Sequence, residues 1–269
     1  MLNDPSPLVL VLPITGAIVG FLAGLLGIGG GFLMVPVMVW LFTALDPANA
    51  VYAVHVAIGT SLATIVPTSV ASARAHWRRG GTDMSALRLW SPLIVIGALG
   101  GGVAARGLEA DVLARIFGVF VGILAIHFAL PNGLPLIRNP PAGPVATRTT
   151  AVAVGLASAL IGIGGAVLSV PALRASGLTM HRAISTGAAI GFFIALPGTV
   201  GYIAAGWGLE GRPDLSLGFV NVGAWLLLLP FSVAMAPVGA SLAHRTDGER
   251  LKRYFALFLA LVAIRMATA

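Results

Sequence analysis

The sequence predicts an all-α integral membrane protein built from two inverted repeats, each a glycine-tipped helix hairpin followed by further transmembrane helices. Three observations support this fold class. Only 9% of the 269 residues are charged and 58% are hydrophobic, whereas a soluble domain carries about 25% charged residues. Apolar stretches of about 20 residues, enough to cross a bilayer core, recur along the chain. A glycine-rich segment near the N-terminus also returns in the second half.

The first apolar stretch is too long for one crossing. Residues 8–45 contain no charged residue and no histidine, and a single helix of that length would measure roughly 57 Å at 1.5 Å per residue. The sequence GIGGG at 27–31 interrupts the stretch, and glycine is a poor helix former. We therefore expect a helix hairpin or a re-entrant pair of helices with the glycines at its tip.

Simpler spans follow the first stretch. They are predicted at about 55–73, 89–107, 112–130, 183–206, 217–243 and 254–268. The stretch 149–180 resembles the first one, because GIGGA at 162–166 stands in its middle. Arg174 interrupts its second arm, so the charge-free part, 149–173, could instead form one helix.

The two long segments form an internal repeat. Residues of the first segment match the second at a constant offset of 135: Gly20, Gly27, Ile28, Gly29, Gly30, Val35 and Pro36 match Gly155, Gly162, Ile163, Gly164, Gly165, Val170 and Pro171. Further on, the six residues from His55 to Thr60 match those from His181 to Thr186 at an offset of 126. We divide the chain into a first transmembrane repeat (1–130), a cytoplasmic linker (131–148) and a second transmembrane repeat (149–269).

The distribution of basic residues favours the hairpin model. Lysine and arginine collect in cytoplasmic loops. If both glycine-tipped segments are hairpins, twelve of the sixteen basic residues fall on one side, in the loops 74–88, 131–148, 174–182 and 244–253. If each segment is a single span, the split is eight and eight. With hairpins, equivalent points of the two halves are separated by an odd number of crossings, which makes the repeats inverted, a recurrent design of secondary transporters.

Several function classes are disfavoured by composition. The net charge of +7 comes from residues in short loops between apolar spans, where orientation signals belong, so we predict no nucleic-acid partner. The chain has no cysteine, which excludes disulfides and thiol catalysis. No histidine pair shows metal-ligand spacing with a carboxylate. The first residues lack a basic leader and are expected in the mature protein. We predict no metal, no cofactor and no particular oligomeric state.

The repeated motifs resemble a known transporter family. GFLAGLLGIGGGFLMVPVM at 20–38, its echo GLASALIGIGGAVLSVPAL at 155–173 and STGAAIGFFIALPGTVGYI at 185–203 are similar to the TauE/SafE sulfite exporter family. The resemblance covers nearly the whole chain and implies a transporter of small anions, sulfite and organosulfonates among them, in the inner (cytoplasmic) membrane. Ala166 departs from the triple glycine, and Ser185-Thr186-Gly187 replaces the Gly59-Thr60-Ser61 order of the first copy; both leave the anion open.

The glycine tips are the first candidate for substrate binding. Helices that start near Gly30 and Gly165 present unpaired N–H groups at the positive end of a helix dipole, where anions bind. Two tips entering from opposite sides would meet near the midplane. Alternatively, the glycines only let helices pack closely. The candidate residues of the tips are Gly29, Gly30, Gly31, Gly164, Gly165 and Ala166.

Hydroxyl side chains in the following spans are the second candidate. Thr60, Ser61, Ser185 and Thr186 can donate hydrogen bonds to sulfite or sulfonate oxygens without the strong attraction of a charge. The alternative is that these hydroxyls bond back to carbonyls of their own helix. Ser169 and Asn221 are weaker candidates.

The titratable residues favour uncoupled transport. All nine acidic residues fall in predicted loops or termini, whereas a carboxylate within a span is the usual sign of proton or cation coupling. His55 and His181 occupy equivalent positions near span ends, where they could anchor the helix or, alternatively, couple protons. We predict export of an anion down its own gradient. A passive channel and an intramembrane enzyme are the alternatives; the enzyme is disfavoured because the nucleophile and metal motifs of hydrolases are missing.

Overall fold

The computed structural model describes the chain except residues 1–5, 27–30, 46, 48–49, 79, 131–142, 244–247 and 268–269. Its elements follow in the order α1 (Ser6–Leu26), α2 (Gly31–Leu45), α3 (Ala53–Arg78), α4 (Met84–Ala104), the 3₁₀ turn η2 (Ala105–Gly107), α5 (Ala110–Ala129), α6 (Gly143–Ile161), α7 (Ala166–Ala175), α8 (Met180–Ala205), β1 (Ser216–Leu217), β2 (Val220–Asn221), α9 (Val222–Ala243) and α10 (Gly248–Ala267). Within the described ranges, six helices are long and apolar enough to cross a membrane. The protein is therefore an all-α membrane protein, as predicted.

The predicted spans correspond to helices, with three differences. The second glycine segment is broken at 162–165, so the single helix over 149–173 does not form. Helix α6 begins at Gly143, so the last residues of the predicted linker are helical. The span predicted at 217–243 begins as a helix only at Val222, because residues 216–221 form a short antiparallel hairpin. Two strands of two residues each are too short to leave a period-2 pattern in the sequence.

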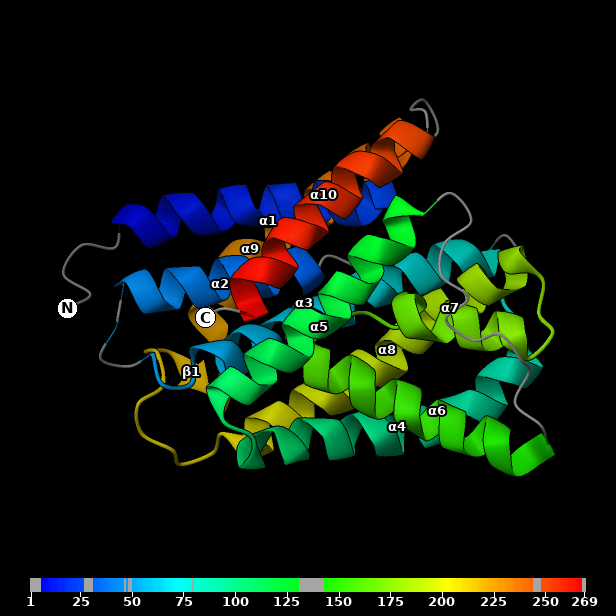
Figure 1. The fold of residues 1–269 in the computed structure, drawn as a ribbon, viewed down its shortest axis with the longest axis horizontal. Coiled ribbons are helices and arrows are strands. Elements are labelled where there is room, and N and C mark those ends of the chain that lie inside the picture. Colours follow the sequence, from blue (N-terminus) through cyan, green and yellow to red (C-terminus); the bar gives the residue numbers. More distant parts are fainter. Residues whose placement is uncertain are drawn as a thin grey trace.

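The first helix of each half packs on the other half. Helix α1 lies along α9, and α6 lies along α4. Figure 1 shows α1 near one edge of the molecule and α4 and α6 near the opposite edge, with α3 and α8 between them. Helix α2 packs on α3, α7 packs on α8, and α5 packs on α10. The same contacts therefore recur in both halves.

Glycines permit the close packing of these pairs. A methyl group on Gly16 would lie 2.5 Å from the carbonyl oxygen of Leu228, and one on Gly20 would lie 2.1 Å from that of Ser232. Both contacts advance in the same direction, so α1 and α9 are parallel. In the other half, a methyl group on Gly97 would lie 2.1 Å from the carbonyl oxygen of Val152. The helix backbones touch directly, as small residues allow in membrane proteins.

Helices α3 and α8, which carry the second repeated motif, pack against each other in opposite directions. Near the start of α3, a methyl group on Gly59 would lie 3.2 Å from Tyr202 Cβ, near the end of α8. Near the end of α3, His76 Nδ1 lies 3.2 Å from Ser185 Oγ, near the start of α8. With the sequence offset of 126, each of these two contacts is the repeat equivalent of the other. The antiparallel α3/α8 pair therefore makes equivalent contacts at its two ends.

Candidate functional site

The two glycine segments meet in the structure. Gly31 is the first residue of α2, and a methyl group on it would lie 2.2 Å from the carbonyl oxygen of Gly162. Gly162 follows α6 with a φ of +71°, a left-handed conformation that suits glycine. We call this contact, between Gly31, Gly162 and the Ser61 side chain, the tip junction. Gly29 and Gly30, also predicted for the site, lie outside the described residues.

Ser61 joins the tip junction from α3. Its hydroxyl donates a hydrogen bond of 2.9 Å to the carbonyl oxygen of Gly162, and it lies 2.9 Å from where a methyl group on Gly31 would stand. Ser61 is fully buried. One predicted hydroxyl is therefore in contact with both glycine segments.

The second segment continues into a helix N-terminus. Gly164 and Gly165 are buried, and α7 begins at Ala166 without a side-chain hydrogen bond at its cap. Gly165 packs on α8, where its added methyl group would lie 2.6 Å from the backbone nitrogen of Gly191. The first N–H groups of a helix have no partner within it, so the start of α7 offers donors and a positive dipole end inside the protein. The side chain of Ala166 is not described.

Thr60 adjoins the tip junction in sequence but uses its hydroxyl elsewhere. The hydroxyl donates to the carbonyl oxygen of Val56 at 2.6 Å and accepts the backbone N–H of Asn221 at 2.9 Å. The bond to Val56 is the bond back to the own helix that the sequence left as an alternative. Ser169 does the same, because its hydroxyl donates to the carbonyl oxygen of Gly165.

Ser185 and Thr186 lie at the other end of the α3/α8 pair. Ser185 contacts His76, and Thr186 Oγ1 accepts the backbone N–H of Asp83 at 2.9 Å. The tips instead approach α8 further along, at Gly191. The structure therefore brings Gly31, Ser61 and the second tip together and places Ser185 and Thr186 apart from them.

The interior around the tips is uncharged. Among the described residues, no Asp, Glu, Lys or Arg side chain is buried. His55 is 1% exposed, and its Nε2 lies 3.0 Å from the carbonyl oxygen of Ala105 and 3.1 Å from that of Leu108. Its repeat equivalent His181 is exposed. His55 thus anchors the turn after α4 to α3, while His181 stands in a different environment.

Sequence reasoning assigned Asp83 to a loop and overlooked its role. Asp83 is the N-cap of α4, and its Oδ1 accepts the N–H of Ala86 at 2.9 Å. An aspartate directly before a helical run is the usual signal for such a cap. The contact of Gly191 with Gly165 had no comparable signal, because one more glycine in a glycine-rich span is not distinctive.

Comparison with known proteins matches nearly the whole chain. A family model described as "Sulfite exporter TauE/SafE" matches residues 12–266. A "Probable membrane transporter protein" of Haemophilus influenzae is 34% identical over 258 residues, which cover 96% of this chain and 97% of the relative. Proteins with the same description from Methanocaldococcus jannaschii (24% identical; 95% and 94% covered) and Xylella fastidiosa strain 9a5c (27%; 93% and 91% covered) also match. No solved structure is significantly similar to the chain.

Proposed function

The chain belongs to the sulfite exporter TauE/SafE family, and on that premise we propose that it is a secondary transporter that exports a small oxyanion, of the sulfite or organosulfonate type, across the inner (cytoplasmic) membrane. Its relatives are named as membrane transporters, and its apolar helices make it a multi-pass membrane protein.

The tip junction is the observation that carries the proposal. It joins one glycine segment from each half at a buried serine. The start of α7 adds N–H groups without helical partners and the positive end of a dipole. Because no charged side chain is buried among the described residues, a bound anion would be held by neutral donors. Such donors release an anion more readily than a buried arginine, as a carrier requires.

Alternating access of two inverted halves is supported by the packing of equivalent helices. The contact of Gly59 with Tyr202 and the contact of His76 with Ser185 are repeat equivalents at opposite ends of the antiparallel α3/α8 pair. Helices α3 and α8 would then cross the membrane in opposite directions. Two halves related in this way can exchange conformations and open the tip junction to one side and then to the other.

Export follows from the charge of the substrate. An inside-negative potential favours outward movement of an anion by about 2.3 kcal/mol per charge per 100 mV. Among the described residues no buried carboxylate is present to carry a coupling proton. We therefore propose transport that is driven by the anion gradient and the potential, without proton coupling.

Sulfite flux in proteoliposomes tests this function. The full chain is reconstituted, and efflux of sulfite is measured as a function of its concentration and of an imposed potential. We expect saturable flux, counterflow of labelled sulfite against an unlabelled gradient, and faster efflux at an inside-negative potential. Flux that does not saturate and shows no counterflow would mean a passive channel, and strict dependence on a proton gradient would contradict uncoupled export.

A further inference from the structure

Two hydrogen bonds link the halves at equivalent positions. Thr60 of α3 accepts the backbone N–H of Asn221, and Thr186 of α8 accepts the backbone N–H of Asp83, both at 2.9 Å. Thr60 and Thr186 correspond at the offset of 126. Each threonine belongs to one half and its donor to the other half. Because α3 and α8 are antiparallel, the two links stand at opposite ends of the pair.

The two donors also cap equivalent helices. Asn221 Oδ1 accepts the N–H of Ala224 at 2.7 Å at the start of α9, and Asp83 Oδ1 accepts the N–H of Ala86 at 2.9 Å at the start of α4. Each link therefore fixes the first turn of a helix of one half to the central helix of the other half. Separating the start of α4 from α8 requires the Thr186 bond to break, and separating the start of α9 from α3 requires the Thr60 bond to break.

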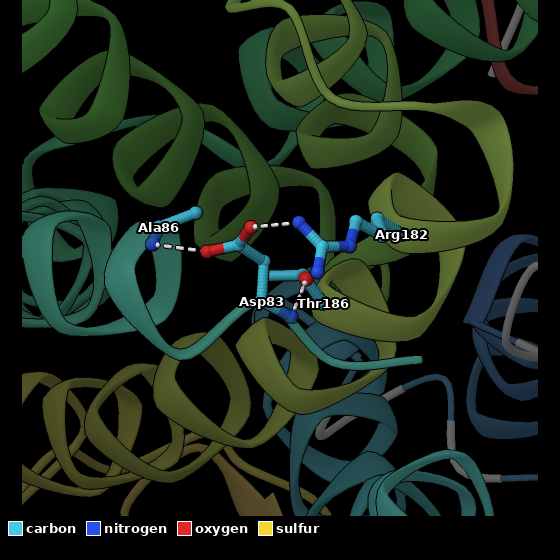
Figure 2. Close-up of polar contacts among 4 residues, drawn as sticks. All are labelled: Asp83, Ala86, Arg182 and Thr186. Carbon is cyan, nitrogen blue, oxygen red and sulfur yellow. Dashed lines mark hydrogen bonds and ion pairs between the residues drawn. The ribbon is translucent and has the colours of Figure 1, made fainter. Parts of the chain in front are cut away.

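Only one of the two links carries an ion pair. Asp83 Oδ2 accepts a hydrogen bond of 3.1 Å from Arg182 Nη1 (Figure 2). At the other end Asn221 is neutral and donates from Nδ2 to the carbonyl oxygen of Asp214 at 2.7 Å. The residue equivalent to Arg182 is Val56, which is fully buried. We call Thr186, Asp83 and Arg182 the charged link, and Thr60 and Asn221 the neutral link.

The ion pair of the charged link is open to a competing anion. The Arg182 side chain is 59% exposed, and that of Asp83 is 19% exposed. A guanidinium presents five N–H donors in a planar fork that matches an oxyanion as well as a carboxylate. An exposed ion pair favours the paired over the separated arrangement of its two side chains by a factor of only about two to five. A soluble oxyanion can therefore displace the carboxylate from the guanidinium.

We propose that a small oxyanion binds Arg182 in place of the Asp83 carboxylate, which leaves the charged link with the Thr186 hydrogen bond alone and lets the start of α4 separate more readily from α8, so that the charged link is an anion-operated gate and the neutral link is not. This inference rests on the proposed function, because the oxyanion is the transported substrate. Arg182 is the third residue of α8 and ends the segment 174–182, which the basic-residue distribution predicts on the cytoplasmic side, from which an exported anion arrives. The substrate thus opens the side on which it is loaded.

Two matched cysteine reporters test the gate. The chain has no cysteine of its own. Ala63 and Ala189 are repeat equivalents that are each 8% exposed, and each lies three residues beyond the threonine of its link. Ala189 belongs to the same buried cluster as Leu87 and Trp90 of α4. In the reconstituted full chain, the rate of maleimide labelling is measured for Ala63→Cys and for Ala189→Cys separately.

Methanesulfonate is the probe, because sulfite itself adds to maleimides. Chloride at equal ionic strength is the control, because added salt alone weakens an exposed ion pair. Relative to chloride, we expect methanesulfonate to raise labelling of Ala189→Cys about two- to fivefold, the factor that the ion pair contributes, and to leave Ala63→Cys unchanged. Asp83→Asn keeps the helix cap and copies the neutral link. In that background, labelling of Ala189→Cys should already be fast in chloride and should no longer respond to methanesulfonate.

Arg182→Gln is the second variant, and it should also abolish the response to methanesulfonate. Equal acceleration of both cysteines, or a response that survives in Asp83→Asn and in Arg182→Gln, would overturn the proposal. The wild-type sulfite flux is measured separately. Flux without a labelling response refutes the gate and leaves the transport function standing, whereas a labelling response without flux of any tested oxyanion supports the gate and refutes the transport function.

Discussion

Replacing Gly31 by alanine tests whether the tip junction binds the anion. The added methyl group would stand 2.2 Å from the carbonyl oxygen of Gly162 and 2.9 Å from Ser61 Oγ. An ordinary contact needs about 3.4 Å or more, so the segments must separate by roughly 1 Å, and overpacking of this kind costs about 1–3 kcal/mol. Alanine regains at most about 1 kcal/mol as the better helix former. We expect a net loss of stability between about zero and 2.5 kcal/mol.

The larger effect should be on transport. A shift of this size removes at least one donor from the oxyanion, and a hydrogen bond to a charged group contributes about 1.5–3 kcal/mol. That corresponds to a roughly ten- to hundredfold increase in the sulfite concentration that half-saturates flux. The assay is concentration-dependent sulfite efflux from proteoliposomes, with thermal unfolding followed in parallel.

Gly100→Ala is the matched control for this substitution. Gly100 lies in α4, and its added methyl group would meet nothing within 4 Å. We expect Gly100→Ala to leave the sulfite concentration that half-saturates flux unchanged. Its stability should equal that of the wild type or be slightly higher. If Gly31→Ala retained wild-type half-saturation while the control behaved as expected, the tip junction would not be the substrate site.

Four further substitutions separate anchoring contacts from substrate contacts. Ser61→Ala removes the hydrogen bond to Gly162 and should lower stability by about 0.5–1.5 kcal/mol and slow sulfite flux; unchanged flux would exclude Ser61 from the path. His55→Gln should lower the free energy of unfolding by about 1–3 kcal/mol, because it replaces a buried ring that contacts two backbone carbonyl oxygens. His181 is exposed, so His181→Gln should change the free energy of unfolding by no more than about 0.5 kcal/mol. Both histidine variants should keep flux without a proton gradient, and loss of transport in well-folded His55→Gln would favour the proton-coupling alternative. Gly20→Ala places a methyl group 2.1 Å from a carbonyl oxygen of α9, so it should destabilise the fold by about 1–3 kcal/mol. The folded fraction should keep the wild-type sulfite concentration for half-saturation. A wild-type melting temperature would contradict the close packing of α1 on α9.

The helical spans were predictable because length and hydropathy determine them. An uncharged run such as 8–45 must break somewhere, and glycines mark the place. Their repetition at 162–166 indicated the second break, and the structure has it at 162–165. The start of α9 was missed because residues 216–221 form a hairpin that is held by residues distant in the sequence as well as nearby, through the bonds of Asn221 to Thr60 and of Gly218 to Arg212.

The partners of the polar side chains were not predictable in the same way. Thr60 and Thr186 were chosen as equivalent hydroxyls, and the structure gives both the same partner type, a backbone N–H from the other half. That partner is 161 residues away for Thr60 and 103 residues away for Thr186, so no local pattern reveals it. His55 and His181 show the reverse case, since equal positions in the repeat carry unequal burial.

We expect the packing of α1 and α6 on the opposite halves to couple the movements of the two repeats. Helix α1 buries its glycine face on α9, and α6 buries its glycine face on α4. In the predicted division into residues 1–130 and 149–269, each half therefore lacks the surface on which its own first helix packs. Because the backbones of α4 and α6 are in direct contact, we expect movement of α4 relative to α8 to move α6 and the segment that leads to Gly162 as well. Release of the charged link can thus reach the tip junction through a parallel helix pair whose backbones are in direct contact.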